Sequence, residues 1–351
     1  MFPVLLVASL SLIGQPPVAS SGEWKTQESR YLKNIRQITF PDTFARAGEG
    51  YFSPDGKTII FQAEEKGADN PFYQIFTMDL ASGKFRRISP GVGKTTCAYF
   101  TPDGKKVIFA STHLDPEAKG QYDQERKVRE EEQKTRKRRR YVWDFDGHFD
   151  IFQANPDGTD LQRLTTTTGY DAEGSFSSDG KQVVYCSNRT GEKNLELFIM
   201  DADGKNARQL THAPGCYNGG PFFSPDGKRV IFRADRQKKD HLQIYVIDTD
   251  GQNERALTNN LDWVHWAPFW HGDSKHIIYT AADHNVPGRP NYDLYWMNVN
   301  NGKKTRLTFA PGADVLPVFS PDGKRVMWTS TRDGRQPGAQ LYIADFTPPT
   351  E

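Results

Sequence analysis

The sequence contains little cysteine, no long apolar run and almost no net charge. Only three of its 351 residues are cysteines, Cys97, Cys186 and Cys216. An odd count with no Cys-x-x-Cys spacing argues against a disulfide framework and a zinc ribbon, so we expect buried free thiols. Lys and Arg total 45 against 44 Asp and Glu, a formal charge of +1. This balance gives no reason to expect a nucleic-acid partner.

The most apolar segment, residues 1–13, is too short to span a bilayer and has the length of a signal-peptide core. The small residues Ala19, Ser20 and Ser21 then offer a cleavage site, so residues 1–21 are interpreted as a signal peptide. No basic residue precedes the run, which leaves an uncleaved anchor or a misassigned start codon as alternatives. We expect an exported protein, periplasmic or extracellular, with no transmembrane anchor after cleavage.

Motifs of common enzymes are missing or incomplete. The segment from Gly91 to Thr96 has the end of a phosphate-binding loop, but Ile88 stands where that loop requires its first glycine. The sequence contains neither a Gly-x-Ser-x-Gly elbow nor a His-Glu-x-x-His helix. No catalytic residue is assigned on this basis, and an enzyme is the less favoured interpretation.

One six-residue phrase occurs six times. In each copy an aromatic residue leads into a turn, most often as Phe-Ser-Pro-Asp-Gly-Lys, and the lead residues are Phe52, Phe100, Phe176, Phe223, Trp270 and Phe319. Their spacings of 48, 76, 47, 47 and 49 residues are close to the length of a four-stranded propeller blade. Pro, Asp and Gly suit successive positions of a tight turn, so each phrase predicts a β-hairpin.

Runs of β-branched and aromatic residues follow each phrase and predict buried strands. Five repeats then end in a strand that closes on Leu-Thr or a close variant, such as residues 207–211. The last repeat lacks this strand, but residues 34–40 have the same pattern ahead of the first hairpin. We therefore predict an all-β, six-bladed propeller over residues 22–351, in which an N-terminal strand completes the last blade.

This repeat resembles that of the TolB-like six-bladed propellers with WD40-like (PD40) repeats, over residues 34–346. The resemblance implies the fold but leaves function open, because such propellers serve as binding platforms, caps or enzymes. It does not extend to the α/β domain that precedes the propeller in TolB, which puts a role in the Tol-Pal system in doubt. The repeat is also similar to that of oligogalacturonate lyases, whose histidine-rich metal centre is not reproduced.

Polar residues recur at two positions ahead of the lead aromatic residues. Five residues ahead stand Asp171, Asn218, His265 and Asp314, and three ahead stand Glu49 and Glu173. Since both positions lie where the chain enters an innermost strand, we expect these six side chains to gather at one mouth of the central channel. They form either a ligand-binding site, with a divalent cation in the channel as an open alternative, or structural caps that bridge the blades.

Trp263 and Trp266 flank His265 and extend this candidate site, because an exposed indole stacks on a sugar ring or clamps a peptide. We therefore predict a binding platform for a protein or oligosaccharide ligand and expect a monomer. No cofactor is firmly implied. The alternative function is a metal-dependent lyase or hydrolase that uses a channel site.

The one long interval between phrases indicates an insertion at residues 115–148, between the second and third strands of blade two. Residues 124–140 contain nine basic and four acidic residues, and Val128 is their only apolar residue. We predict a solvated helix or a disordered arm with no face that docks on the core. Residues 135–140 either recruit an acidic partner or simply solubilise the loop.

Overall fold

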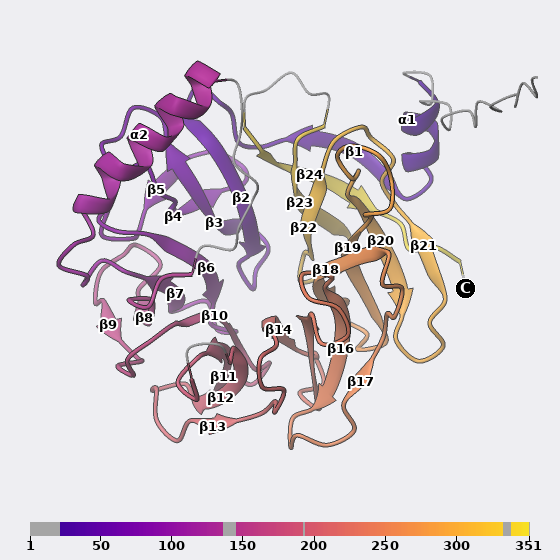
Figure 1. Ribbon diagram of the computed structural model, residues 1–351. Coiled ribbons are helices and arrows are strands. Elements are labelled where there is room, and N and C mark those ends of the chain that lie inside the picture. The colour runs from indigo at the N-terminus through magenta and orange to yellow at the C-terminus, as the bar shows by residue number, and fades with distance from the viewer. Residues whose placement is uncertain (1–21, 136–144, 192–193, 333–337, 351) are drawn as a thin grey trace, which may run out of the picture.

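Six four-stranded antiparallel sheets surround a central axis in the computed structural model, which describes residues 22–135, 145–191, 194–332 and 338–350 (Figure 1). Blade one contains β2 (Phe44–Phe52), β3 (Thr58–Glu65), β4 (Gln74–Asp79) and β5 (Phe85–Arg87). Blade two contains β6 (Thr95–Phe100), β7 (Val107–Ser111), β8 (Asp150–Ala154) and β9 (Gln162–Arg163). Blade three contains β10 (Asp171–Phe176), β11 (Gln182–Ser187), β12 (Glu196–Asp201) and β13 (Arg208–Gln209).

The other three blades follow the same plan. Blade four contains β14 (Asn218–Phe223), β15 (Arg229–Ala234), β16 (Gln243–Asp248) and β17 (Arg255–Ala256). Blade five contains β18 (Trp263–Trp270), β19 (His276–Asp283), β20 (Asp293–Asn298) and β21 (Lys304–Arg306). Blade six contains β22 (Asp314–Phe319), β23 (Arg325–Ser330), β24 (Gln340–Phe346) and β1 (Leu32–Gln37). The predicted six-bladed propeller is confirmed.

The repeated phrase forms its hairpin through local hydrogen bonds. In blade one the Ser53 hydroxyl donates to Asp55 at 2.6 Å and accepts from the Thr58 amide, while the Lys57 amide donates to Asp55. Gly56, at φ +68°, provides the left-handed residue that this turn needs. The phrase therefore fixes one end of every innermost strand. We call this side of the ring the hairpin face, and the side on which the chain enters each innermost strand the entry face.

The terminal hydroxyl residue of each closing strand explains the Leu-Thr pattern. In all six blades it accepts a hydrogen bond of 2.8–3.0 Å from an amide at the start of the third strand, as Ser89, Thr165, Thr211, Thr258, Thr308 and Thr39. The preceding apolar residue packs inward, as Leu210 and Leu307 show. Each closing strand is thus held by a side-chain bond as well as by its short ladder.

The N-terminal segment completes blade six. β1 pairs antiparallel with β24, with Leu32 opposite Phe346 and Gln37 opposite Tyr342. The strand begins and ends earlier than residues 34–40, but Ile38 and Thr39 still bond Leu341 beyond its last ladder pair. Ahead of it, α1 (Glu23–Glu28) docks beside blade six, where the buried Glu28 contacts Arg332 at 3.2 Å. The predicted leader, residues 1–21, lies outside the described residues.

The insertion between β7 and β8 carries α2 (Gly120–Thr135), which lies beside blade one (Figure 1). Arg129 pairs with Glu64 at 2.6 Å and donates to the carbonyl of Pro71, and Arg126 pairs with Asp69 at 2.5 Å. Tyr122 lies just ahead of residues 124–140, is buried, and accepts a hydrogen bond from the Gly93 amide at 2.9 Å, so it anchors the start of the helix. The expectation that no face of this helix docks is therefore wrong, because polar and aromatic contacts replace the missing stripe.

Among the described residues, no helix combines the length and apolar character needed to cross a membrane.

Candidate functional site

The central channel is lined by the six residues that stand three positions ahead of the lead aromatic residues. They are Glu49, Cys97, Glu173, Gly220, Ala267 and Leu316, and every one has a positive φ between 46° and 59°. The strand register shifts at this point in all six blades, so each residue is part of a β-bulge. Only one of the six is glycine. The bulge therefore belongs to the architecture, and the side chain placed on it is free to vary.

Bulge amides connect neighbouring blades around the channel wall. The Glu49 amide donates to the Thr329 hydroxyl at 3.0 Å, and the Leu316 amide donates to the Thr280 hydroxyl at 3.2 Å. The Gly220 amide instead donates to the Glu173 carboxylate at 2.5 Å. Glu173 thus performs in blade three the bridging role that threonine performs elsewhere.

Aromatic side chains close the channel toward the hairpin face. Tyr51, Tyr99, Phe222 and Phe269 each stand one residue before a lead aromatic residue. Tyr51 of blade one contacts Phe222 of the opposite blade four, with ring centroids 5.7 Å apart, and Phe222 contacts Phe269 at 5.0 Å. We call these four rings the aromatic floor. The channel is consequently a blind pocket that these rings close on the hairpin side.

Arg233 enters this pocket from the second strand of blade four. Its Nη2 atom donates to Glu173 at 2.9 Å and to the Tyr217 hydroxyl at 2.8 Å. Two adjacent glycines make room for it, because a Cβ on Gly220 would collide with Nη1 of Arg233 and a Cβ on Gly219 would collide with the Tyr217 ring. No other innermost strand among those described has two glycines at these positions.

Glu173 has its carboxylate fully engaged. It accepts from Tyr170 and Tyr217 at 3.2 Å each, in addition to Arg233 and the Gly220 amide. Four donors satisfy the lone pairs of a buried carboxylate, so Glu173 orders the pocket wall and has little capacity left for a ligand.

Glu49 is the less engaged carboxyl group. Burial, opposed by a hydrogen bond from the Cys97 thiol and reinforced by the negative charge of Glu173, raises the pKa of Glu49 to about 7. Apart from the Cys97 thiol, its one hydrogen-bond donor among the described residues is the Tyr51 hydroxyl, at 3.4 Å. Burial and these two carboxylates also raise the pKa of the Cys97 thiol, which therefore stays protonated and acts as a donor. Glu49 can thus exchange a proton near neutral pH.

The residues five positions ahead of the lead aromatic residues do not line the pocket. Asp171, Asn218 and Asp314 each hydrogen-bond an arginine of their own blade, namely Arg189, Arg236 and Arg332. Each arginine stacks on aromatic rings of its second and third strands. The structure therefore separates these three residues from Glu49 and Glu173 and gives them contacts that hold their blades together.

The aromatic part of the predicted site is divided in the same way. His265 is buried between the rings of Trp263 and Tyr279, and burial together with the charge of Lys304 lowers its pKa to about 4. Trp266 instead lies next to the pocket, with the Arg233 guanidinium 5.8 Å from its ring centroid. Its Nε1 atom is buried with no hydrogen-bond partner in the described part of the chain. Trp266 thus borders the site, whereas His265 packs the blade.

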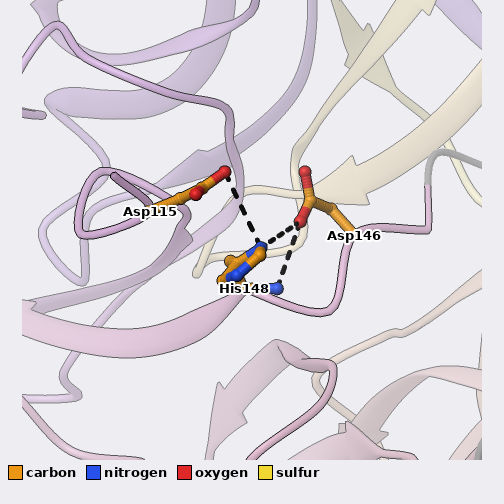
Figure 2. A group of neighbouring side chains, drawn as sticks. All are labelled: Asp115, Asp146 and His148. Carbon is orange, nitrogen blue, oxygen red and sulfur yellow. Dashed lines mark hydrogen bonds and ion pairs between the residues drawn. The ribbon is translucent and has the colours of Figure 1, made fainter. Parts of the chain in front are cut away.

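Within the described residues, the only group of three potential metal ligands lies at the base of the insertion and not in the channel. Figure 2 shows Asp115, Asp146 and His148, with the His148 ring 3.3 Å from Asp146 and 3.7 Å from Asp115. Gln121 donates to both carboxylates, and Lys94 pairs with Asp146 at 3.2 Å. These donors already satisfy the two buried acids, so the group holds the two ends of the insertion together through side-chain contacts.

Sequence reasoning missed Arg233, which lines the pocket, and Tyr217, whose hydroxyl hydrogen-bonds both Arg233 and Glu173. Arg233 lies on a second strand, whereas the predicted site residues all lie on innermost strands. The signal was present as the pair Gly219-Gly220, since two consecutive glycines in a buried strand indicate close approach by another group.

The fold and its channel define a TolB-like six-bladed propeller. A TolB homologue of Chlorobium luteolum is 40% identical over 57 residues, which are 16% of this chain and 13% of the relative. Putative TolB from Agrobacterium tumefaciens superposes with a TM-score of 0.61 at 17% identity, over 91% of this chain and 98% of that one.

Oligogalacturonate lyase from Vibrio parahaemolyticus has a TM-score of 0.54 at 14% identity, over 89% of this chain and 93% of that one. No family model matches the sequence. The identities of the two solved structures are low enough that they show the fold alone. The matched segment of the Chlorobium relative covers only a small part of its length, so it carries no statement about activity.

Proposed function

We propose that this protein is an exported binding platform that holds a protein or carbohydrate ligand at the entry-face mouth of its channel. The observation that carries the proposal is the blind pocket, which has one open end, a closed aromatic floor and ionisable groups in its wall. Concave sites with apolar surface and a few convergent polar groups are the usual form of a ligand site. The rings of Tyr217 and Trp266 lie beside the Arg233 guanidinium, with centroids 5.6 and 5.8 Å from it, and bring aromatic surface close to the pocket.

The two halves of the pocket differ in chemistry. Glu49, Cys97, Glu173 and Arg233 supply polar groups from blades one to four, whereas Pro268, Pro317 and neighbouring apolar residues line the side of blades five and six. A ligand group that enters the pocket therefore meets hydrogen-bonding partners on one side only. This asymmetry supports recognition of an oriented, partly apolar group.

An enzyme remains the second candidate because of Glu49. A carboxyl group with a pKa near neutral is suited to general acid–base catalysis. A metal-dependent lyase or hydrolase would in addition need a metal bound by pocket residues, and the triad at the insertion base lies elsewhere. Cleavage of oligogalacturonate in the presence of Mn²⁺ by the wild type, lost in Glu49→Gln, would favour the enzyme over the platform.

Site-specific photo-cross-linking tests which face binds. A photoreactive residue at Lys238, in the entry-face loop between β15 and β16, is compared with one at Lys105, in the exposed blade-two hairpin. The cross-linkable chains are expressed with the leader intact, and envelope fractions are examined for adducts. We expect a discrete adduct from Lys238 alone. Adducts of equal yield from both positions would show that the entry face is not the binding face.

Glycans are tested directly with a soluble oligosaccharide panel and thermal melting. If a sugar binds at the mouth, Trp266→Ala should abolish the stabilisation, while Trp263→Ala, which changes a ring beside the buried His265, should leave it. Loss in the Trp263 variant alone would place the sugar away from the pocket. Export is tested separately by N-terminal sequencing of the protein recovered from the envelope, and an intact Met1 would contradict the proposed cleavage.

A further inference from the structure

Arg233 has an unused hydrogen-bonding edge inside the pocket. Only its Nη2 atom engages acceptors within the described residues, while its Nε and Nη1 atoms make no hydrogen bond there. Nη1 lies against Gly220, which also lines the pocket. Arginine carries five N–H donors in a fixed planar fork. A largely buried guanidinium with free donors requires acceptors from water or from a ligand.

The surroundings of that edge limit the kind of acceptor that fits. Glu173 already neutralises one charge of Arg233, and Glu49 contributes a second carboxyl group to the same wall. A doubly charged phosphate would therefore meet two nearby acids with only one cation. A singly charged, planar carboxylate matches a guanidinium edge in shape and in charge. The apolar half of the pocket suits an apolar substituent on that carboxylate.

We propose that the channel pocket binds a carboxylate group on the free edge of Arg233, next to the Glu49 side chain in the same pocket wall. The proposal rests on the pocket being the ligand site and names the chemistry that the site recognises. The carboxylate belongs either to a small free acid or to the C-terminal residue of a peptide. Both present the same group to the same edge, so the experiment separates them.

Proton exchange at Glu49 makes this binding dependent on pH. The groups that act on Glu49 come from four strands: Tyr51 of β2, Cys97 of β6, Glu173 of β10 and Arg233 of β15. Burial raises the pKa of the Cys97 thiol and of the Tyr51 phenol, so both stay neutral, and the pKa of Arg233 is raised well above its ordinary value. The pKa of Glu49, by contrast, lies near neutral. A carboxylate bound in the same pocket is repelled once Glu49 ionises, so affinity falls as pH rises above about 7.

Titration calorimetry of the full chain with sodium benzoate tests the free-acid source. The peptide source is tested with N-acetyl-glycyl-phenylalanine, which has a free C-terminal carboxylate. The same dipeptide with an amidated C-terminus is the comparison. We expect binding of benzoate or of the free-carboxylate dipeptide at pH 6, no binding of the amide, and a loss approaching tenfold per pH unit above pH 7. Binding of benzoate alone identifies a small acid, and preferential binding of the dipeptide identifies a peptide terminus.

Two variants separate this mechanism from general effects. Glu49→Gln keeps a neutral side chain, so it should bind at pH 6 and lose the pH dependence. Arg233→Lys keeps the charge opposite Glu173 but loses the planar edge, and affinity should fall at least tenfold. Arg229→Lys is the matched control, because Arg229 lies on the same strand and contacts Trp270 outside the pocket.

Three results would overturn the proposal: no binding of either free carboxylate at pH 6, equal binding of the amide, or a wild-type pH dependence retained in Glu49→Gln. If Arg233→Lys does not fold, the Glu49→Gln comparison still decides. The failure of this inference can be told apart from the failure of the proposed function. If the wild type binds no carboxylate but cross-linking from position 238 persists in Glu49→Gln and Arg233→Lys, this inference is wrong and the proposed binding platform is still supported.

Discussion

Asp314→Ala tests whether the residues five positions ahead of the lead aromatic residues have a structural role or a role at the channel mouth. Asp314 accepts from the Trp328 indole at 3.0 Å, the Ser330 hydroxyl at 2.5 Å and the Arg332 guanidinium at 2.8 Å. All these groups are buried, and Arg332 is only 4% exposed. Removal of the carboxylate therefore leaves an indole N–H, a hydroxyl and one side of a guanidinium without an acceptor.

The cost can be worked out from these contacts. A buried donor left unsatisfied costs about 1–3 kcal/mol, and a broken buried ion pair costs about 3–5 kcal/mol. Arg332 keeps its contact with Glu28, which retains part of the pairing. We therefore expect about 3–5 kcal/mol in total for Asp314→Ala. With an unfolding entropy of about 2 cal/mol/K per residue, this loss corresponds to a decrease in Tm of roughly 4–7 °C.

Asp171→Ala serves as the graded comparison in the same differential scanning calorimetry experiment. Its partner Arg189 is 19% exposed, so water can replace part of the lost hydrogen bonding. We expect about 1–2 kcal/mol for this variant. Asp314→Asn, which keeps one acceptor oxygen, should fall between the wild type and Asp314→Ala. Unchanged or increased stability of Asp314→Ala would refute the reasoning, because it would mean that removal of a repelling charge outweighs the lost contacts.

Three other perturbations test closure, the insertion and the pocket. Thr39→Val removes the acceptor for the Leu341 amide and should lower the free energy of unfolding in urea by about 1–2 kcal/mol. Thr211→Val, which removes the corresponding acceptor in blade three, should have the same effect. An unchanged free energy of unfolding for Thr39→Val would show that β1 does not hold blade six. Excision of residues 116–140 with a short Gly-Ser bridge should cost about 1–3 kcal/mol, because the contacts of Arg129 with Glu64 and of Tyr122 with Phe72 of blade one are lost. This outcome is contrary to the sequence expectation, and an unchanged Tm would show that docking contributes nothing. The pKa of Glu49 is raised to about 7 in the folded state, so the stability that protonated Glu49 contributes is fully present below the unfolded pKa of about 4.5 and is lost as pH rises to 7. The free energy of unfolding of Glu49→Gln should therefore rise relative to that of the wild type between pH 4.5 and 7, and the difference should stay constant above pH 7. A constant difference from pH 4.5 to 8 would contradict the raised pKa.

The blade plan followed from the sequence because its determinants are local. The hairpin phrase contains its own hydrogen-bonding partners within six residues, and the closing strands carry a recognisable threonine. The same pattern identified the N-terminal strand in blade six, although its ladder begins two residues earlier than the pattern suggested. Local chemistry of this kind needs no knowledge of the tertiary structure.

The candidate site was predicted only in part, for a specific geometric reason. In a regular strand the positions three and five residues ahead of the lead aromatic residue would face the same side. The bulge inserts an extra residue between Ala172 and Ser175, which turns Glu173 into the channel while Asp171 stays with Arg189. Arg233 arrives from another strand through a gap left by two glycines. Neither effect can be read from spacing within one strand.

Closure of blade six by β1 has a consequence for the order of events during synthesis. β1 precedes its partner β24 by more than three hundred residues, so it is synthesised long before the strand with which it pairs. Blades one to five each consist of neighbouring strands and can pair as they emerge. β1 therefore stays without its partner strand until β24 has been made, and Glu28 stays without Arg332 until shortly before that. A chain interrupted ahead of β24 leaves both β1 and β23 without the strand that joins them.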